Sequence, residues 1–301
     1  MGKIAFVFSG QGDQYPGMGK ELAEKYAGAA KIFDMCDNIR PGTSAQCFCG
    51  SDEELKETKN TQPCLFALEL AIAAVLIEAG IKADALAGFS LGEVVACTFG
   101  GIVDYETGFR LVCKRGELMQ EVAEKHDTSM AAVLKLSAEK LIELCSRYDN
   151  IYPVNFNCPG QITVSGLAAE MPAFYDDVKA VGGRALPLKV KGAFHSPFMR
   201  EAADAFAKVL LETELKPSGV RIYSNLTAEP YTEDIAYLLS RQISNPVRFE
   251  NIIRNMIADG IDTFVEIGPG KTLTNMIGRI DSSVRAYSTS DLETVINEIK
   301  Q

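Results

Sequence analysis

Three short apolar runs along the chain each end at a glycine-rich turn, and each is followed by apolar residues at helical spacing. This combination is typical of buried strands that lead into helices. The runs are residues 3–8, 83–88 and 262–266, and the helical patterns after them are at 17–33, 91–99 and from 272 onward. The alternation predicts an α/β fold with a mainly parallel sheet whose two faces are both covered by helices.

Helix start and stop signals extend this pattern. Asn60 or Thr61 can cap a helix whose second turn begins near Cys64 and which ends at Gly80. Asp104 can cap a further helix that runs to about residue 125. The remaining predicted elements of this body are helices at 196–211 and 247–258 and a strand at 221–224.

The segment between residues 128 and 191 has a different pattern. Its apolar positions predict the order β-α-β-β-α-β, with a hairpin turn at Cys158-Pro159-Gly160. The predicted strands are 130–136, 152–157, 161–165 and 184–190, and the predicted helices are 138–148 and 169–181. This order is the signature of a ferredoxin-like unit. We therefore expect a ferredoxin-like subdomain at 128–191, inserted into a larger α/β body formed by 1–127 and 192–301.

Composition limits the partners and cofactors. Of the 301 residues, 47% are apolar and 23% are charged, which is ordinary for a globular protein. A net charge of −10 argues against nucleic acid as the main partner. The eight cysteines form no CxxC pair, and the two histidines lie far from the neighbouring Cys47 and Cys49. We therefore expect no metal site and no cofactor.

Targeting and membrane signals are weak. The N-terminal apolar stretch is too short for the core of a signal peptide. The most apolar segment, residues 65–77, contains Glu69 and is too short to span a bilayer. Unpaired cysteines in apolar helical patterns are typical of a reducing compartment. We expect a cytoplasmic protein with no membrane association, and a monomer.

Ser90 lies in the pentapeptide Gly88-Phe89-Ser90-Leu91-Gly92, between a predicted strand and a predicted helix. In this context Gly-x-Ser-x-Gly predicts a nucleophile elbow, in which the first glycine allows a sharp turn and the second allows close packing. The helix that follows points its N-terminal N–H groups at the same place and can stabilise an oxyanion. Ser90 is therefore the candidate nucleophile, and we expect the large body to be α/β-hydrolase-like.

A serine nucleophile needs a general base, and the chain has two histidines. His126 lies among charged residues at the predicted junction, which is typical of a solvated surface histidine. His195 lies in Gly192-Ala193-Phe194-His195-Ser196-Pro197, where the predicted insertion returns to the body. His195 is the candidate base, and a buried structural histidine is the alternative.

Two further segments are candidates for ligand binding. The turn Gly10-Gln11-Gly12-Asp13-Gln14 lets a backbone N–H approach a ligand closely, although an ordinary turn explains the same residues. Its spacing is neither a P-loop nor a dinucleotide fingerprint. Arg115 lies in a mostly apolar helical pattern. An inward-facing guanidinium would hold a carboxylate in a bidentate fork, whereas an outward-facing one would be solvated.

Taken in order, these motifs resemble those of the malonyl-CoA:acyl carrier protein transacylase family, which includes the acyltransferase domains of polyketide synthases. The resemblance covers the chain from end to end, and the joint order and spacing of the motifs make it specific. The matching segments are 10–14 with 17–19, 61–63, 88–93, 115–116 with 119–120, 157–161 with 165–166, 194–196, 245–247 and 266–270.

The resemblance implies a two-step exchange. Ser90 attacks the malonyl thioester of coenzyme A while His195 takes its proton, and the N–H groups of Gln11 and Leu91 hold the oxyanion. The malonyl-serine then passes its acyl group to the phosphopantetheine thiol of an acyl carrier protein, in fatty acid biosynthesis. In the family a backbone carbonyl orients the histidine, and the matching position is Gln242, so no triad acid is expected.

The resemblance also implies residues that bind the substrate. Arg115 matches the arginine that pairs with the malonyl carboxylate, and Gln62 and Asn157 match substrate-binding positions. Phe194 lies in a segment similar to the malonyl-type signature of polyketide acyltransferases, so malonyl is expected over methylmalonyl. The chain departs from the family at Phe89, where histidine is usual. Because that position lines the pocket beside the acyl group, we expect Phe89 to affect fine acyl selectivity.

An acidic carrier protein would need a local basic surface on this acidic chain. Lys189, Lys191 and Arg200 flank His195 in the sequence, and Arg184 lies on the adjoining predicted strand. We name these four residues the basic cluster and expect it to dock the carrier and to contact phosphate. Scattered solvated charges are the alternative.

Other functions are compatible with some or all of these motifs. A lipase or esterase also has Gly-x-Ser-x-Gly, but Arg115 and the lack of an HGGG-type oxyanion loop argue against it. An editing acyl hydrolase or a discrete trans-acting acyltransferase of a polyketide pathway would keep the whole site. A binding scaffold on this fold would not need a nucleophile, a base and an arginine together.

Overall fold

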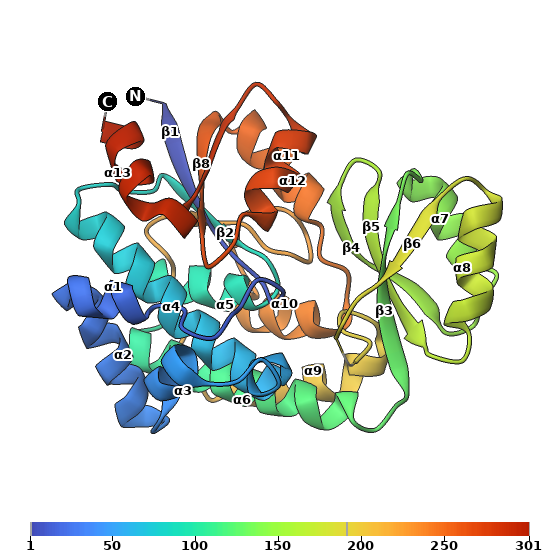
Figure 1. The fold of residues 1–301 in the computed structure, drawn as a ribbon, viewed down its shortest axis with the longest axis horizontal. Helices are drawn as coiled ribbons and strands as arrows, with labels where there is room; N and C mark the ends of the chain where they lie inside the picture. The colour runs from blue at the N-terminus through green and yellow to red at the C-terminus, as the bar shows by residue number, and fades with distance from the viewer. Residues whose placement is uncertain (1, 191, 301) are drawn as a thin grey trace.

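The computed structural model describes residues 2–190 and 192–300. Within them, a parallel sheet has the strand order β7-β2-β1-β8-β9, which places β1 at its centre (Figure 1). The strands are β1 (Lys3–Phe8), β2 (Ala85–Gly88), β7 (Arg221–Ile222), β8 (Ile261–Ile267) and β9 (Arg285–Ser288). The predicted α/β body with a mainly parallel sheet is confirmed.

The carboxyl ends of the central strands lie level with one another. Phe8 at the end of β1 pairs with Gly88 of β2 on one side and with Ile267 of β8 on the other. The loops after these strands, including the Gly-x-Ser-x-Gly turn, therefore leave the sheet at the same edge. In parallel α/β sheets, ligands bind in the crevice outside this edge.

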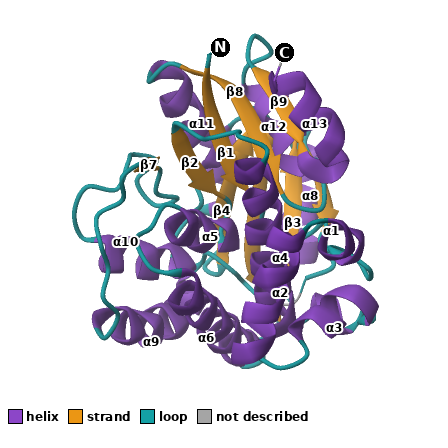
Figure 2. Cartoon of the chain, turned by 90° about the vertical axis from the view of Figure 1, so that its left-hand side faces the viewer, coloured by secondary structure: helices purple, strands orange, loops and turns teal. Residues whose placement is uncertain are grey.

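Different helices cover the two faces of the parallel sheet, and Figure 2 shows α4, α6 and α9 gathered on the side away from α11. The larger layer contains α1 (Lys20–Lys25), α2 (Ala27–Ile39), α3 (Thr43–Cys49), α4 (Thr58–Glu78), α5 (Leu91–Phe99), α6 (Tyr105–Ala123), α9 (Arg200–Leu211), α10 (Ile235–Arg241) and α13 (Leu292–Lys300). The smaller layer contains α11 (Phe249–Ala258) and α12 (Thr272–Ile280).

Side chains along each strand alternate between these layers because successive Cβ atoms of a strand point to opposite faces. In β1, Phe6 and Phe8 join the core of the larger layer, whereas Ala5 and Val7 join the core of the smaller one. The sheet is therefore buried on both sides, as its nearly continuous apolar strands predict.

Helix α4 crosses the middle of the larger layer. Among the described residues it is the helix long and apolar enough to cross a membrane by length and composition, and 83% of its most apolar window is buried inside the protein. Even Glu69 on this helix is fully buried. This burial is typical of the core helix of a folded domain.

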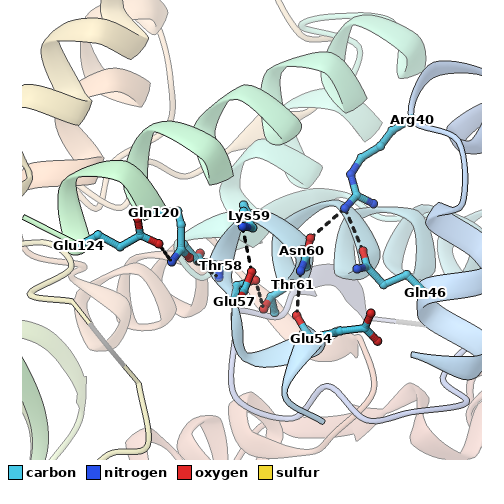
Figure 3. A network of polar contacts seen from close by, with 10 residues as sticks. All are labelled: Arg40, Gln46, Glu54, Glu57, Thr58, Lys59, Asn60, Thr61, Gln120 and Glu124. Atoms are coloured by element: carbon cyan, nitrogen blue, oxygen red, sulfur yellow. Dashed lines mark hydrogen bonds and ion pairs between the residues drawn. The ribbon is translucent and has the colours of Figure 1, made fainter. Parts of the chain in front are cut away.

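The start of α4 differs from the prediction. The helix begins at Thr58, so Asn60 lies in its first turn and does not cap it. Figure 3 shows the polar contacts at this end. The Thr58 N–H donates to Gln120 Oε1 at 3.1 Å, Asn60 Nδ2 donates to the Glu54 carbonyl at 3.0 Å, and Arg40 donates to Asn60 Oδ1 at 2.9 Å. The Gln120 side chain thus satisfies the first N–H of the helix, while Arg40 and the Glu54 carbonyl bind the Asn60 side chain.

The second sheet is antiparallel and has the order β4-β5-β3-β6, the strand order of a ferredoxin-like unit. Its elements follow the predicted sequence: β3 (Thr128–Leu134), α7 (Ala138–Cys145), β4 (Ile151–Cys158), β5 (Gln161–Leu167), α8 (Met171–Ala180) and β6 (Arg184–Pro187). It has a hydrophobic core of its own. The exact bounds of the subdomain stay a prediction, and its last predicted residue, Lys191, lies outside the described residues.

The two sheets are joined beside the carboxyl edge of β1 and β2 (Figure 1). Val247 bonds through its backbone to both Val154 and Phe156 of β4. Arg279 of α12 donates to Gln161 Oε1 at 2.6 Å and to the Pro159 carbonyl at 3.1 Å. These contacts hold β4 and β5 against the carboxyl edge of the parallel sheet.

Several other elements differ from the prediction. The helix expected at 17–33 is two helices, α1 and α2, separated by Tyr26 in an extended conformation. The helix expected from 196 begins with a 3₁₀ turn at Pro197–Met199 because Pro197 follows the capping Ser196. The short elements α3, α10, β9 and α13 had no predicted counterpart, since brief segments carry too little periodicity to be recognised.

Candidate active site

The Gly-x-Ser-x-Gly segment forms a sharp turn between β2 and α5. Ser90 has φ 55° and ψ −103°, a conformation that non-glycine residues rarely adopt. A Cβ on Gly88 would lie 1.9 Å from the carbonyl carbon of Gly92, and a Cβ on Gly92 would lie 2.3 Å from the Phe8 carbonyl oxygen. Both glycines are therefore required for strand, turn and helix to approach this closely.

His195 contacts Ser90 directly. Its Nε2 lies 2.8 Å from Ser90 Oγ, and its Nδ1 lies 2.8 Å from the backbone carbonyl oxygen of Gln242. A carbonyl oxygen can only accept, so Nδ1 carries the proton and Nε2 is free to accept from the serine hydroxyl. This is the tautomer that a general base needs, and a backbone carbonyl sets it.

The surroundings of His195 keep it neutral. The ring is buried, with 4% of the residue exposed. Burial, followed by the positive charge of Arg115, lowers the pKa of His195 to about 4. The backbone at His195 has φ 62°, and its N–H donates to the Ile243 carbonyl at 3.1 Å. The fold therefore imposes an uncommon backbone conformation that brings the imidazole to the serine.

Arg115 reaches the same point from α6, in the larger layer. Its Nη2 donates to Ser90 Oγ at 3.2 Å and to Gln242 Oε1 at 2.7 Å, and its Nη1 donates to Gln62 Oε1 at 2.6 Å. The arginine is 1% exposed. The guanidinium thus faces the nucleophile, the inward-facing option that the sequence left open.

The charge of Arg115 has no carboxylate hydrogen-bonded to it. Its partners are two glutamine side chains and a hydroxyl, and its Nε has no partner among the described residues. Burial lowers its pKa to about 10, so the guanidinium is still charged at neutral pH. A buried cation with neutral partners favours an anionic group beside Ser90.

The amide N–H groups around Ser90 differ in whether they already have an acceptor. Ser90 N donates to Asn225 Oδ1 at 2.8 Å, and the two amides after Leu91 donate to carbonyls within the turn. The N–H groups of Leu91 and Gln11 have no acceptor in the part of the chain that the structure describes. These two amides are therefore available to a ligand at the carboxyl edge of β1 and β2.

The side chain of Gln11 is tied into the arginine network. Thr58 Oγ1 donates to Gln11 Oε1 at 2.7 Å and accepts from Gln62 Nε2 at 2.8 Å. Gln62 in turn accepts from Arg115. One run of hydrogen bonds therefore connects the turn after β1 to α4 and α6, and it fixes the predicted residues relative to one another.

Asn225, which sequence reasoning missed, holds the nucleophile turn. Its Oδ1 accepts from Ser90 N at 2.8 Å and its Nδ2 donates to the Gly88 carbonyl at 2.6 Å. Behind it, Glu93 Oε1 accepts from Asn225 N at 2.8 Å and from the Tyr231 hydroxyl at 2.6 Å. Burial raises the pKa of Glu93 to about 7. The available signal was a polar residue just after the predicted strand at 221–224.

Gln242 contributes more than the predicted carbonyl. Its side-chain Nε2 donates to the Ser90 carbonyl at 2.6 Å, while its Oε1 accepts from Arg115. Through its backbone it also accepts from His195. A single residue at the end of α10 thus contacts Ser90, His195 and Arg115.

A cavity of about 220 Å³ opens beside the turn, between the two sheets. Its lining includes Gln11 and Phe89 from the parallel sheet, Asn155 and Asn157 from β4, and Leu188 after β6. The two asparagines are 9% and 4% exposed, and their Oδ1 atoms have no partner among the described residues. Buried amide oxygens without partners indicate a cavity built for a hydrogen-bonding ligand.

A second, larger cavity of about 770 Å³ lies between α1 and the segment around Ser290. Its lining includes Tyr15, Lys25 and Glu293, and none of the residues near Ser90 described above. The smaller cavity is the one beside the site, because Gln11 and Phe89 line it, although Ser90, His195 and Arg115 themselves do not.

The remaining predicted residues fall in three places. Phe194 is 9% exposed and packs in the core of the larger layer. His126 is exposed, and its ring stacks near Phe198 with a centroid distance of 5.3 Å. Of the basic cluster, Arg184, Lys189 and Arg200 are exposed, and Lys191 lies outside the described residues.

Among residues 2–190 and 192–300, no group of three or more His, Cys, Asp or Glu could hold a metal ion.

Known proteins share both the sequence and the fold. The acyl transferase domain family matches residues 5–295. A malonyl CoA-acyl carrier protein transacylase from Bacillus subtilis (strain 168) is 39% identical, over 98% of this chain and 96% of that protein. The crystal structure of the malonyl CoA-acyl carrier protein transacylase from Clostridium perfringens has a TM-score of 0.95 and 34% identity, covering 99% and 97% of the two chains.

A third similar protein was solved with a partner. It is a malonyl-transacylase in complex with the holo acyl-carrier protein of a type II polyketide synthase. Its TM-score with this chain is 0.94 and the identity is 33%, and the match covers 98% of this chain and 99% of that one.

Proposed function

The chain belongs to the malonyl-CoA:acyl carrier protein transacylase family, and we propose that Ser90, His195 and Arg115 carry out its malonyl transfer. The enzyme moves a malonyl group from malonyl-CoA to an acyl carrier protein, as its relatives' names state. The observation that carries the assignment of residues is the meeting at Ser90 Oγ of a neutral imidazole and a buried guanidinium.

The first half of the reaction forms an ester. Ser90 Oγ attacks the thioester carbonyl as His195 Nε2 takes the hydroxyl proton, and the carbonyl oxygen becomes an oxyanion between the N–H groups of Gln11 and Leu91. When the oxyanion collapses, the C–S bond breaks and His195 gives its proton to the departing coenzyme A thiolate. The product is a malonyl-Ser90 ester and free coenzyme A.

The second half reverses these roles. The pantetheine thiol of the carrier protein gives its proton to His195 Nε2, and its sulfur attacks the ester carbonyl at the same oxyanion site. The C–O bond of the ester then breaks, and His195 returns the proton to Ser90 Oγ. Because the Gln242 carbonyl fixes the tautomer of His195, no carboxylate is needed to orient it.

Arg115 supplies the selectivity for an anionic acyl group. A malonyl carboxylate beside the guanidinium would pair directly with a buried charge whose hydrogen-bond partners among the described residues are neutral, while the buried Glu93 acts on it without a hydrogen bond. An acetyl group leaves that charge unsatisfied, so acetyl-CoA should be a poor substrate. Gln62 holds the guanidinium in place, and the bulk of Phe194 disfavours a methyl branch on the acyl group.

The cavity lined by Asn155 and Asn157 receives the arm that carries the thiol. At about 220 Å³ it is smaller than the roughly 300–1,000 Å³ of drug-sized ligand sites, and it suits the end of a slender chain. The unpartnered oxygens of the two asparagines are acceptors for the amide N–H groups of pantetheine.

The carrier protein docks at the mouth of this cavity. Leu188 lines the cavity and is 39% exposed, so the neighbouring Lys189 lies beside its opening. Lys189 and Arg184 provide positive charge for an acidic carrier on a chain whose net charge is −10. We place the docking surface at these residues of the basic cluster.

The carrier of fatty acid synthesis is the proposed physiological acceptor. The similarity to a malonyl-transacylase bound to a type II polyketide carrier favours one alternative, a polyketide carrier. Measuring kcat/KM for the two kinds of carrier decides between them, and the physiological carrier should be preferred at least tenfold.

Capture of radiolabel from malonyl-CoA tests the assignment of residues. The wild-type enzyme should become labelled and should pass the label to a phosphopantetheinylated carrier protein, whereas S90A should stay unlabelled. Labelling of S90A would remove Ser90 from its role. Release of free malonate at the same rate with and without carrier protein would show a hydrolase instead of a transferase.

A further inference from the structure

Phe89 lies on the opposite face of the parallel sheet from Arg115. It follows β2, in which Ala85 and Ala87 join the core beside α11 and α12, while Leu86 joins the core of the larger layer. Phe89 is two residues after Ala87, so its side chain points to the same face of the sheet as Ala85 and Ala87. It packs against the core beside α11 and α12. Its ring meets that of Phe249 edge-on, with centroids 5.5 Å apart.

Arg115 reaches Ser90 from the other side. It belongs to α6, which lies across the parallel sheet from α11 and α12 (Figure 1). Its contacts are with Gln62, Gln242 and the serine hydroxyl. The two residues therefore flank the nucleophile from opposite faces, and the anion site is separate from the Phe89 ring.

The side chain of Phe89 is part of the cavity for the thiol arm. It lines that cavity together with Gln11, Asn155 and Asn157, whereas the next residue, Ser90, and the residues of the anion site, Arg115 and Gln62, do not line it. The ring also lies against Gly10, where a Cβ would be only 2.9 Å from Phe89 Cδ1. Phe89 thus forms an apolar wall in a cavity that Asn155 and Asn157 also line, and the buried Oδ1 atoms of these asparagines have no partner among the described residues.

We propose that Phe89 recognises the pantetheine arm of the thiol carrier and has no part in the choice of acyl group. This proposal rests on the proposed function. The ring packs against the methylene groups of the arm while Asn155 and Asn157 accept from its amides, so both coenzyme A and the carrier protein are held alike. Replacement of the family's histidine by Phe89 then changes the fit of the arm and leaves the preference for malonyl intact.

Single-turnover kinetics with paired substrates test this. The variants are F89A and F89L, and F264L is the control because Phe264 belongs to the same core but does not line the cavity. Malonyl and acetyl thioesters of coenzyme A compare acyl groups. Pantetheine and 2-mercaptoethanol, added to the isolated malonyl-enzyme, compare a thiol with the arm to one without it.

For F89A we expect deacylation by pantetheine to slow about tenfold relative to wild type, the change that about 1.4 kcal/mol of lost contact produces. Deacylation by 2-mercaptoethanol and the malonyl-to-acetyl ratio should stay within about twofold, and F89L should lie between F89A and wild type. The control F264L should keep the wild-type ratio of the two thiols, even if its Tm falls.

A changed malonyl-to-acetyl ratio in F89A with equal slowing of both thiols would overturn the proposal. Failure of the proposed function gives a different result, because the wild-type enzyme would then form no malonyl-enzyme from malonyl-CoA.

Discussion

The two sides of Ser90 differ in how completely their polar groups are satisfied. On the acyl side, Arg115, Gln62, Gln242 and Thr58 bond to one another and to Ser90, and Arg115 Nε alone of this network has no partner among the described residues. On the thiol side, the buried oxygens of Asn155 and Asn157 have no partner among the described residues, and the cavity wall mixes apolar side chains such as Phe89 with polar ones such as Gln161.

This difference indicates how each side treats its ligand. In the proposed function the acyl side is preorganised around the fixed charge of Arg115, which would discriminate strongly between anionic and neutral acyl groups. The thiol side offers weak, separate contacts to an arm that must enter and leave twice in each cycle. Weak contacts suit that exchange, because tight binding of coenzyme A would slow the arrival of the carrier protein.

Removal of the fixed charge should have the largest effect. In R115A we expect kcat/KM for malonyl-CoA to fall about 100-fold or more, because the malonyl carboxylate loses its only charged partner. The acetyl-CoA rate should fall much less, so the malonyl-to-acetyl ratio collapses. The control is K114A, an exposed neighbour on the same helix whose ion pair with Glu117 lies at the surface. An unchanged malonyl-to-acetyl ratio in R115A would mean that the enzyme does not select the acyl group by its charge.

Loss of the hydrogen bonds that hold the turn at Ser90 should have the second-largest effect. In N225L the Ser90 N–H loses its acceptor and the Gly88 carbonyl loses its donor, so we expect kcat to fall about tenfold or more with little change in KM. N225D keeps the acceptor and should recover part of the rate.

The matched control is N255L, which also removes a side-chain hydrogen bond to a backbone carbonyl, that of Ala228. Circular dichroism and Tm of each variant separate misfolding from misplacement. Equal losses in N225D and N225L at an unchanged Tm would contradict a positioning role for the acceptor.

Removing one polar side chain from the thiol side of Ser90 should have a smaller effect on the kinetics. In N157A we expect KM for malonyl-CoA to rise about three- to tenfold, the usual worth of one hydrogen bond, with the malonyl-to-acetyl ratio unchanged. The comparison of the two sides predicts that N157A and R115A affect separate quantities. If N157A altered acyl selectivity, the division at Ser90 would be wrong.

The pH dependence should show the smallest change, a profile flatter than that of an ordinary histidine base. Burial and Arg115 lower the pKa of His195 to about 4, so its neutral form persists as pH falls through 6.5. We expect kcat/KM to stay level from about pH 8 to pH 5 and to fall only as pH approaches 4. A half-maximal rate near pH 6.5 would show that the imidazole is more solvated than its buried position indicates. Repeating the profile with E93Q removes any contribution from Glu93, whose pKa is about 7.

Much of the fold could be predicted because its elements carry their own signals. Helix α5 has the predicted bounds, and the β-α-β-β-α-β order of the smaller sheet follows from turns and apolar spacing along the chain. The start of α4 was missed because Arg40 and Gln120, which bond to residues of its first turn, are distant in the sequence. Short edge elements such as β9 were missed because four residues give no measurable period.

The sequence by itself pointed to Ser90 and His195 as the candidate nucleophile and base. Glycine is the only residue type small enough for positions 88 and 92 of the Ser90 turn. Of the two histidines, His195 lies in a loop that can be buried. The tertiary structure alone decided what surrounds them. Whether Arg115 points inward, which residue holds Ser90 N–H, and which face Phe89 joins all depend on the strand register and on how distant helices pack. The meeting of these residues is a property of that packing, because no local pattern records which segments become neighbours across a sheet.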